Sequence, residues 1–244
     1  MAKKILVSQP KPQTEKSPYF DVANKYGLEL DFRPFIKVEA MSARDFRQQR
    51  VQIPGHTAIV FTSRHAIDHF FALCKELRVS IPDDMKYFCV SEQVSLYIQK
   101  YVQYRKRKNF FPESGRINDL IPIMVKHKAE NYFVPQSSIH TDDLANMLDE
   151  AGLEHDEAVM YYTVPNDFPE DAVFDYNMVV LFSPEGIHSL LKNFPDFKEK
   201  NAKLACLGIK TIKAAEEAGL HVDYQPTAEL RSVPAIIEAY AKTV

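Results

Sequence analysis

Short apolar runs alternate with amphipathic stretches along most of this chain. In residues 179–194, "VVLFSPEGIHSLLKNF", an apolar run of strand length leads into a second stretch, whose apolar residues have the i, i+3, i+4, i+7 spacing of a helix. Ser183 suits the N-cap of that helix, and Pro184 suits its first position. The pattern predicts a buried strand followed at once by a helix whose first N–H groups face open space.

The same pattern occurs 120 residues earlier, in "VFTSRHAIDHFFALC" at residues 60–74, where Ser63 aligns with Ser183. We call these two segments the A units. A second pattern, the B unit, follows each of them, as "YFCVSEQVSLYIQKY" at residues 87–101 and "LACLGIKTIKAAEEA" at residues 204–218. Each B unit also combines a strand, a short turn and a helix with apolar residues at helical spacing.

A third pattern, the C unit, is the loosest of the three. It occurs as "ILVSQPKPQTEKSPYFDVANKYGLE" at residues 5–29 and as "YFVPQSSIHTDDLANMLDEAGLE" at residues 132–154. Gly27 and Gly152 suit the position just after a helix end, where the backbone commonly turns left-handed. The six units therefore run in the order C, A, B, C, A, B, which indicates a duplication.

Strands that alternate with helices predict an α/β fold with parallel sheets covered on both faces. The order of the units predicts a discontinuous lobe 1 of residues 1–33 and 165–244, and a continuous lobe 2 of residues 39–157. Residues 34–38 and 158–164 then form two hinge strands, which we expect to pair antiparallel. A single large doubly wound sheet is the alternative.

Composition narrows the class of protein. A net charge of −3 over 244 residues argues against a nucleic-acid partner, so the basic run at residues 105–108 is interpreted as a charged turn before a short strand. Pro122 is expected in the first turn of the next helix. Cys74, Cys89 and Cys206 lack metal-ligand spacing and indicate buried thiols in a reducing compartment. Without a signal segment or a spanning apolar run, we expect a cytoplasmic protein with no membrane partner. No feature demands a dimer, so we expect a monomer.

The common catalytic motifs are absent: there is no glycine-rich phosphate loop, HExxH, CxxC or GxSxG. What remains are small polar turns where strands lead into helices, and ligands of open α/β sheets bind at that edge. Helix starts there also attract anions, so we expect a cleft for a polyanion between the lobes. Ordinary N-caps are the alternative for each turn. One of these turns is Gln136-Ser137-Ser138. The candidate binding residues are Thr62, Ser63, Arg64, Ser91, Glu92, Gln93, Ser137, Ser138, Ser183, Pro184, Glu185, Gly186, Gly208, Ile209, Lys210 and Thr211.

In this order the segments resemble the uroporphyrinogen-III synthase family. The resemblance is carried by "VFTSRHAI", "LFSPEGIH", "LGIKTIKAAEEAGL", "YYTV" and "SPYFDVANKYGLELDFRPFIKVE". It implies two flavodoxin-like lobes joined by a two-stranded linker. It also implies an enzyme that closes the carboxylate-rich linear tetrapyrrole hydroxymethylbilane to uroporphyrinogen III, with inversion of the last ring and without a metal or organic cofactor. A catalytically silent tetrapyrrole- or anion-binding module on the same fold is the alternative.

The resemblance also singles out a candidate catalytic residue. Tyr161, in "EAVMYYTVPN", matches the tyrosine of the family's Tyr-x-Thr-Val motif. The reaction that the family implies begins with loss of a terminal hydroxyl, to which a neutral phenol can donate a hydrogen bond. Packing is the alternative, because tyrosine suits strands and Tyr162 is expected on the opposite face. Many bacterial members carry an arginine where this chain has Gln9, and we expect Arg64 and Lys210 to supply that positive charge.

Overall fold

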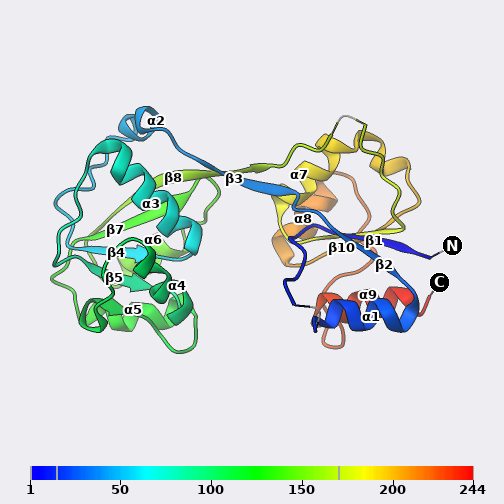
Figure 1. Cartoon of the computed structure of the whole chain (residues 1–244), viewed down its shortest axis with the longest axis horizontal. Helices are drawn as coiled ribbons and strands as arrows, with labels where there is room; N and C mark the ends of the chain where they lie inside the picture. The colour runs from blue at the N-terminus through cyan, green and yellow to red at the C-terminus, as the bar shows by residue number, and fades with distance from the viewer. Residues whose placement is uncertain (1, 15, 170, 244) are drawn as a thin grey trace. The chain divides into compact units, whose positions relative to one another are not determined.

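The computed structural model describes residues 2–14, 16–169 and 171–243. The chain divides into two compact units, which Figure 1 shows. The terminal unit consists of Met1–Lys37 and Val164–Val244, and the central unit of Val38–Thr163. Within the described residues the strands form two separate sheets, one of four strands and one of six. The alternative of one large sheet is therefore wrong.

The terminal unit holds the four-stranded sheet, which is parallel throughout and has the order β10-β9-β1-β2. Its strands are β1 (Lys4–Val7), β2 (Glu29–Phe32), β9 (Met178–Leu181) and β10 (Lys203–Cys206). Its helices are α1 (Pro18–Tyr26), α7 (Pro184–Asn193), α8 (Ile209–Glu217) and α9 (Val233–Ala241), with a 3₁₀ helix, η3 (Pro195–Glu199). Helix α1 packs with α9 and α7 packs with α8, so a pair of helices covers each face of the sheet.

The central unit holds the six-stranded sheet, with the order β3-β8-β7-β4-β5-β6. Its strands are β3 (Ile36–Ala40), β4 (Ala58–Phe61), β5 (Lys86–Cys89), β6 (Asn109–Phe110), β7 (Tyr132–Ser137) and β8 (His155–Pro165). Its helices are α2 (Ala43–Gln48), α3 (Arg64–Leu77), α4 (Glu92–Tyr97), α5 (Ile117–Val125) and α6 (Asp143–Glu150), with 3₁₀ helices η1 (Ile98–Lys100) and η2 (Lys106–Lys108). The core on one face is built with α2, α3 and α4, and the core on the other with α5 and α6.

The two sheets place equivalent units side by side in the same order. In the terminal unit the strands of the B, A and C units are β10, β9 and β1; in the central unit they are β5, β4 and β7. All of these neighbours pair parallel. The repeated order of units that the sequence indicated is therefore confirmed by the topology.

The chain passes between the units along β3 and β8, which are neighbours in the central sheet. The Met41 N–H donates to the Met160 carbonyl and the Asn166 N–H donates to the Phe35 carbonyl, so the two segments run in opposite directions. Residues 158–161, expected in a hinge strand, instead pair with β7 inside the central sheet. They do so because β7 continues beside β8 as far as Ser137.

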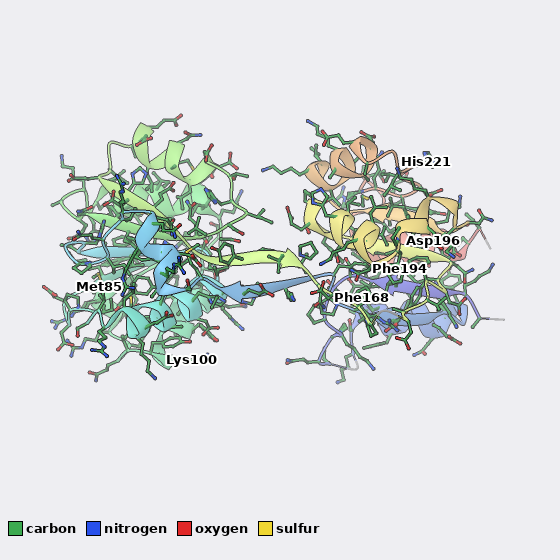
Figure 2. All side chains as sticks on the ribbon, turned by 90° about the horizontal axis from the view of Figure 1, so that it is seen from above. Met85, Lys100, Phe168, Phe194, Asp196 and His221 are labelled. Atoms are coloured by element: carbon green, nitrogen blue, oxygen red, sulfur yellow. The ribbon has the colours of Figure 1, made fainter. Side chains whose placement is uncertain are left out.

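An aromatic cluster anchors the segment after β8 inside the terminal unit. The Phe168 ring lies 5.0 Å from that of Phe35 and 5.7 Å from that of Phe194, measured between centroids. Figure 2 labels Phe168 and Phe194 on their ribbons. The Phe168 N–H also donates to the Asn193 side chain. The return crossing is thus fixed by packing as soon as it enters this unit.

Three smaller predictions can be checked against the fold. The basic run forms η2 and leads into β6, as predicted. Pro122 lies in the interior of α5 and not in its first turn, because the helix begins at Ile117. Cys74, Cys89 and Cys206 are free and buried, and burial raises the pKa of each thiol to about 12.

Two kinds of feature are absent from the described part of the chain. No helix in it has both the length and the apolar character needed to cross a bilayer. No group of three or more histidine, cysteine, aspartate or glutamate side chains in it is arranged to hold a metal ion.

Candidate functional site

The A helices begin as their sequence predicts. Ser63 and Ser183 each follow a fully buried strand, adopt an extended backbone and accept a hydrogen bond at the N-cap. The Ser63 hydroxyl accepts from the Ala66 N–H at 3.0 Å, and the Ser183 hydroxyl accepts from the Gly186 N–H at 3.2 Å. Pro184 occupies the first turn of α7. Both hydroxyls therefore serve as N-caps. The N–H groups of Arg64 and His65 in α3 are left for a ligand, whereas α7 leaves only that of Glu185, because Pro184 has no N–H.

The strand ends bring the candidate residues into two groups, one in each unit. In the central unit, the turns after β4, β5 and β7 lie at one edge of a sheet, because these strands are parallel neighbours. That edge carries Thr62, Ser63, Arg64, Ser91, Glu92, Gln93, Ser137 and Ser138. In the terminal unit, the turns after β9 and β10 share an edge for the same reason, and it carries Ser183, Pro184, Glu185, Gly186, Gly208, Ile209, Lys210 and Thr211.

Some of these side chains are occupied or unsuited to an anion. The Thr211 hydroxyl is buried and donates to the Leu207 carbonyl at 2.9 Å, so it fixes the start of α8. Gly186 is buried, and a Cβ there would lie 3.5 Å from the Leu181 side chain. Glu92 and Glu185 lie in first helical turns, where a carboxylate complements the helix dipole and would repel an anionic ligand. Only the backbone at these two positions fits anion binding.

The B helices begin differently from one another. Ser91 is an extended N-cap whose hydroxyl accepts from the Val94 N–H at 3.4 Å. Gly208, its repeat partner, starts α8 at φ 93° and ψ 144°, a conformation that favours glycine. Beyond it Ile209 is 73% exposed and Lys210 is exposed. The exposed Gln93 follows Ser91 in the same way.

Two cations stand at helix starts. The Arg64 guanidinium lies 5.4 Å from the centre of the Tyr97 ring, while Lys210 extends from the first turn of α8. Neither side chain forms an ion pair with another residue that the structure describes. Both cations are therefore outside direct ion pairs, at edges that also carry the carboxylates of Glu92 and Glu185.

A β-bulge sets the direction of Tyr161. Gln136 pairs with Val159 and Ser137 pairs with Tyr161, so Met160 is an extra residue in β8. Regular alternation would send Met160 and Tyr161 to opposite faces, but both belong to the core beneath α3. Tyr161 is 7% exposed, and its hydroxyl oxygen lies 3.5 Å from the Ser63 Oγ. Tyr162, expected on the opposite face, is half-buried and also packs against this core.

The end of β7 holds β8 in place after the bulge. The Ser138 N–H donates to the Tyr161 carbonyl at 2.8 Å, and the Thr163 N–H donates to the Ser138 hydroxyl at 3.2 Å. The hydroxyl oxygens of Ser137 and Thr163 are 2.8 Å apart. Thr163 stands in the "YYTV" segment, but sequence reasoning did not select it as a site residue.

Gln136 lies at the same strand end, on the other face of the sheet from Tyr161. Its side chain is buried and donates to the Glu157 carboxylate at 2.6 Å. Burial raises the pKa of that carboxyl above its usual range. Gln136 therefore satisfies an internal acid and is not directed at the turn.

His69 is a second residue that the sequence did not single out. Its imidazole stacks on the Tyr161 ring, with 5.1 Å between centroids and 19° between planes. Burial lowers the pKa of His69, and the nearby His65 lowers it further. Helical spacing could have placed His69 on the buried face of α3, because it is three residues from the buried Ala66 and four from the buried Leu73.

Together these residues make a site of hydroxyl groups around Tyr161 at the edge of the central sheet. Its side chains donate and accept hydrogen bonds, but they include no close pair of a base and a nucleophile. Such an arrangement can hold a substrate, bind its anionic groups and stabilise charge that develops on an oxygen.

Comparison with known proteins finds a matching family and similar solved structures. The family described as uroporphyrinogen-III synthase HemD matches residues 19–232. The uroporphyrinogen-III synthetase of Helicobacter pylori is similar in structure, with a TM-score of 0.60 at 14% identity over 99% of this chain and 100% of that one. A mutant uroporphyrinogen III synthase of Thermus thermophilus gives 0.53 at 13% identity, over 99% and 98%. These structural similarities show the fold. No curated protein matches this chain.

Proposed function

Because the chain belongs to the uroporphyrinogen-III synthase family, we propose that it closes hydroxymethylbilane to uroporphyrinogen III with inversion of the last ring. Membership makes it an enzyme of tetrapyrrole biosynthesis that acts on a small molecule. The proposed reaction needs neither a metal nor an organic cofactor. We further expect a cytoplasmic monomer, whose oligomeric state sedimentation equilibrium would measure.

The substrate carboxylates bind at the strand-end turns of both units. Helix α3 presents its first N–H groups there, and α7, which begins with a proline, presents the N–H of Glu185. An anion at a helix start gains about 0.3–1 kcal/mol at an exposed site. Arg64 and Lys210 add full positive charges beside the starts of α3 and α8. These interactions are made equally by the bound substrate and by its transition state, so they contribute to affinity.

Tyr161 assists the first chemical step. Its phenolic O–H donates a hydrogen bond to the terminal hydroxyl of the substrate. The hydroxyl departs as water together with the N–H proton of the same pyrrole ring, and the C–O bond is broken to leave an azafulvene. The substituted carbon of the last ring then attacks to form a spiro intermediate, which fragments and recloses with that ring inverted. The protein must hold the chain so that this carbon reacts first, which is a matter of positioning.

One observation supports Tyr161 in this role. The bulge in β8 turns the Tyr161 ring toward α3, and its hydroxyl oxygen ends 3.5 Å from Ser63 at the start of that helix. This separation is at the limit of a hydrogen bond, so the hydroxyl is only weakly engaged within the protein. The Tyr161 side chain is 7% exposed, so the proposal requires a substrate oxygen to reach its hydroxyl beside the start of α3 and to replace Ser63 as its weakly held partner.

The ratio of product isomers tests the proposal. Hydroxymethylbilane closes spontaneously to the I isomer, so formation of the III isomer above that background identifies the enzyme. Tyr161→Phe removes only the donor and is expected to lower kcat by roughly 10²–10⁴-fold. Its effect on stability should stay below about 1 kcal/mol, because the lost hydrogen bond is weak.

Tyr162→Phe is the matched control and should change neither kcat nor stability. A wild-type protein that yields only the I isomer would overturn the proposed activity. Full activity in Tyr161→Phe would overturn the role of the tyrosine while leaving the activity intact.

A further inference from the structure

We propose that His69 is a positioning residue that holds the Tyr161 ring in its reactive orientation, an inference that rests on the proposed function. The two rings are nearly parallel, at 19°, with 5.1 Å between their centroids. Offset stacking at this distance is a favoured arrangement of two aromatic rings. His69 thus fixes the plane of the phenol.

Helix α3 holds the tyrosine at two points. Ser63, its N-cap, lies beside the phenolic oxygen, and His69, nearly two turns further along, covers the ring face. The tyrosine itself stands directly after the extra residue of a bulge, where the ladder between β7 and β8 is irregular. The Tyr161 backbone is held by the hydrogen bond from the Ser138 N–H, but this bond does not set the rotamer of the side chain. The contacts from the helix act on the side chain itself.

The imidazole suits a positioning role better than a chemical one. Burial and the neighbouring His65 both lower the pKa of His69, so the ring is held in its neutral form. Asp68 is the group on the same helix that favours the charged form. The interaction with Tyr161 is through the ring faces, so neither ring nitrogen is directed at the phenolic oxygen.

Two substitutions distinguish a need for any planar aromatic ring at position 69 from a need for the imidazole itself. His69→Phe keeps a planar ring and should retain kcat within about threefold, since stacking is preserved. His69→Ala removes the ring and should lower kcat, by up to about 10²-fold for a displacement of the phenol near 1 Å, with KM unchanged. His188→Ala, an exposed histidine of the repeat helix α7, is the matched control and should leave both constants unchanged.

A spectroscopic measurement reports on Tyr161 directly. With ¹³C-labelled tyrosine, the Tyr161 ring signals are assigned by their loss in Tyr161→Phe. They should shift in His69→Ala and keep a ring-current shift in His69→Phe. If His69→Ala does not fold, His69→Asn, which also lacks the aromatic ring, takes its place.

The outcomes distinguish this inference from the proposed function. Wild-type kcat and unmoved Tyr161 signals in His69→Ala would overturn the inference alone. Equal loss of kcat in His69→Phe and His69→Ala would also overturn it, because the imidazole itself would then be required. Full activity in Tyr161→Phe would instead overturn the role of the tyrosine, on which the inference depends, whatever the His69 variants do.

Discussion

Gly208 offers a sharp test of the backbone at a helix start. Its φ of 93° and ψ of 144° place it outside the left-handed helical region that asparagine tolerates. Gly27, in the same unit, lies inside that region at φ 62° and ψ 39°. An added Cβ would meet no atom within 4 Å at either glycine. The two positions therefore differ in backbone conformation and not in available space.

The expected magnitudes follow from that difference. Gly208→Ala should lower the free energy of unfolding of the terminal unit by about 1–3 kcal/mol, the cost of a residue held in a glycine-only region. Gly27→Ala should cost about 1–2 kcal/mol, the penalty of the left-handed conformation for a residue with a Cβ. Asparagine should recover part of the loss at Gly27 but not at Gly208, because asparagine visits only the left-handed helical region readily.

The assay must follow the terminal unit by itself. The chain has no tryptophan, so hydrogen exchange measured by mass spectrometry over a urea series is preferable to intrinsic fluorescence. Peptides of the terminal unit should lose protection at lower urea in Gly208→Ala, while peptides of the central unit serve as an internal control. A Gly208→Asn protein as stable as Gly27→Asn would refute the reasoning, because the backbone would then have relaxed into an ordinary conformation.

Three further predictions concern charge, pH and capping. The double variant Arg64→Gln, Lys210→Gln should raise KM with little change in kcat. Steady-state kinetics that show no change in KM at any salt concentration would contradict this prediction. Burial raises the pKa of Glu157 in the folded state. The protonated carboxyl therefore stabilises the folded state fully below the unfolded pKa, and this stabilisation is lost as pH rises through the folded pKa. Urea melts of Glu157→Gln should lack this dependence of stability on pH. Ser183→Ala should lower the free energy of unfolding by about 1 kcal/mol, because the N-cap of α7 is lost, and Ser183→Asp, measured in the same melts, should restore it.

The fold was predictable because its signals are local and repeated. Each A unit shows its buried strand, its serine N-cap and its helix face within sixteen residues or fewer, and the order of the units then dictates the pairing of the strands. Pro122 was misplaced because the start of α5 has no side-chain cap to mark it. Hydrophobic spacing shows that a helix exists more clearly than it shows where the helix begins.

The surroundings of Tyr161 were not predictable, because they depend on pairing between distant strands. Nothing in "EAVMYYTVPN" marks Met160 as the extra residue of a bulge, since the bulge exists only relative to β7. A strict period of two would place Met160 and Tyr161 on opposite faces, and only the pairing with β7 shows that they share one. The contact with His69 depends on the same bulge, because it turns Tyr161 toward α3.

Equivalent positions of the two A helices make different contacts. Position 69 on α3 corresponds to Ser189 on α7, which is buried and donates to the Asn166 carbonyl at 3.4 Å. In both units the same turn of the A helix thus contacts the return segment that contains β8: through an aromatic ring at Tyr161 and through a hydroxyl at Asn166. The contact with the return segment belongs to the repeated architecture, whereas the aromatic pair is confined to the central copy. We therefore expect Ser189→Ala to change the stability of the terminal unit without lowering kcat as His69→Ala does, and an equal loss of kcat in the two variants would show that the A-helix contact serves only to hold the fold.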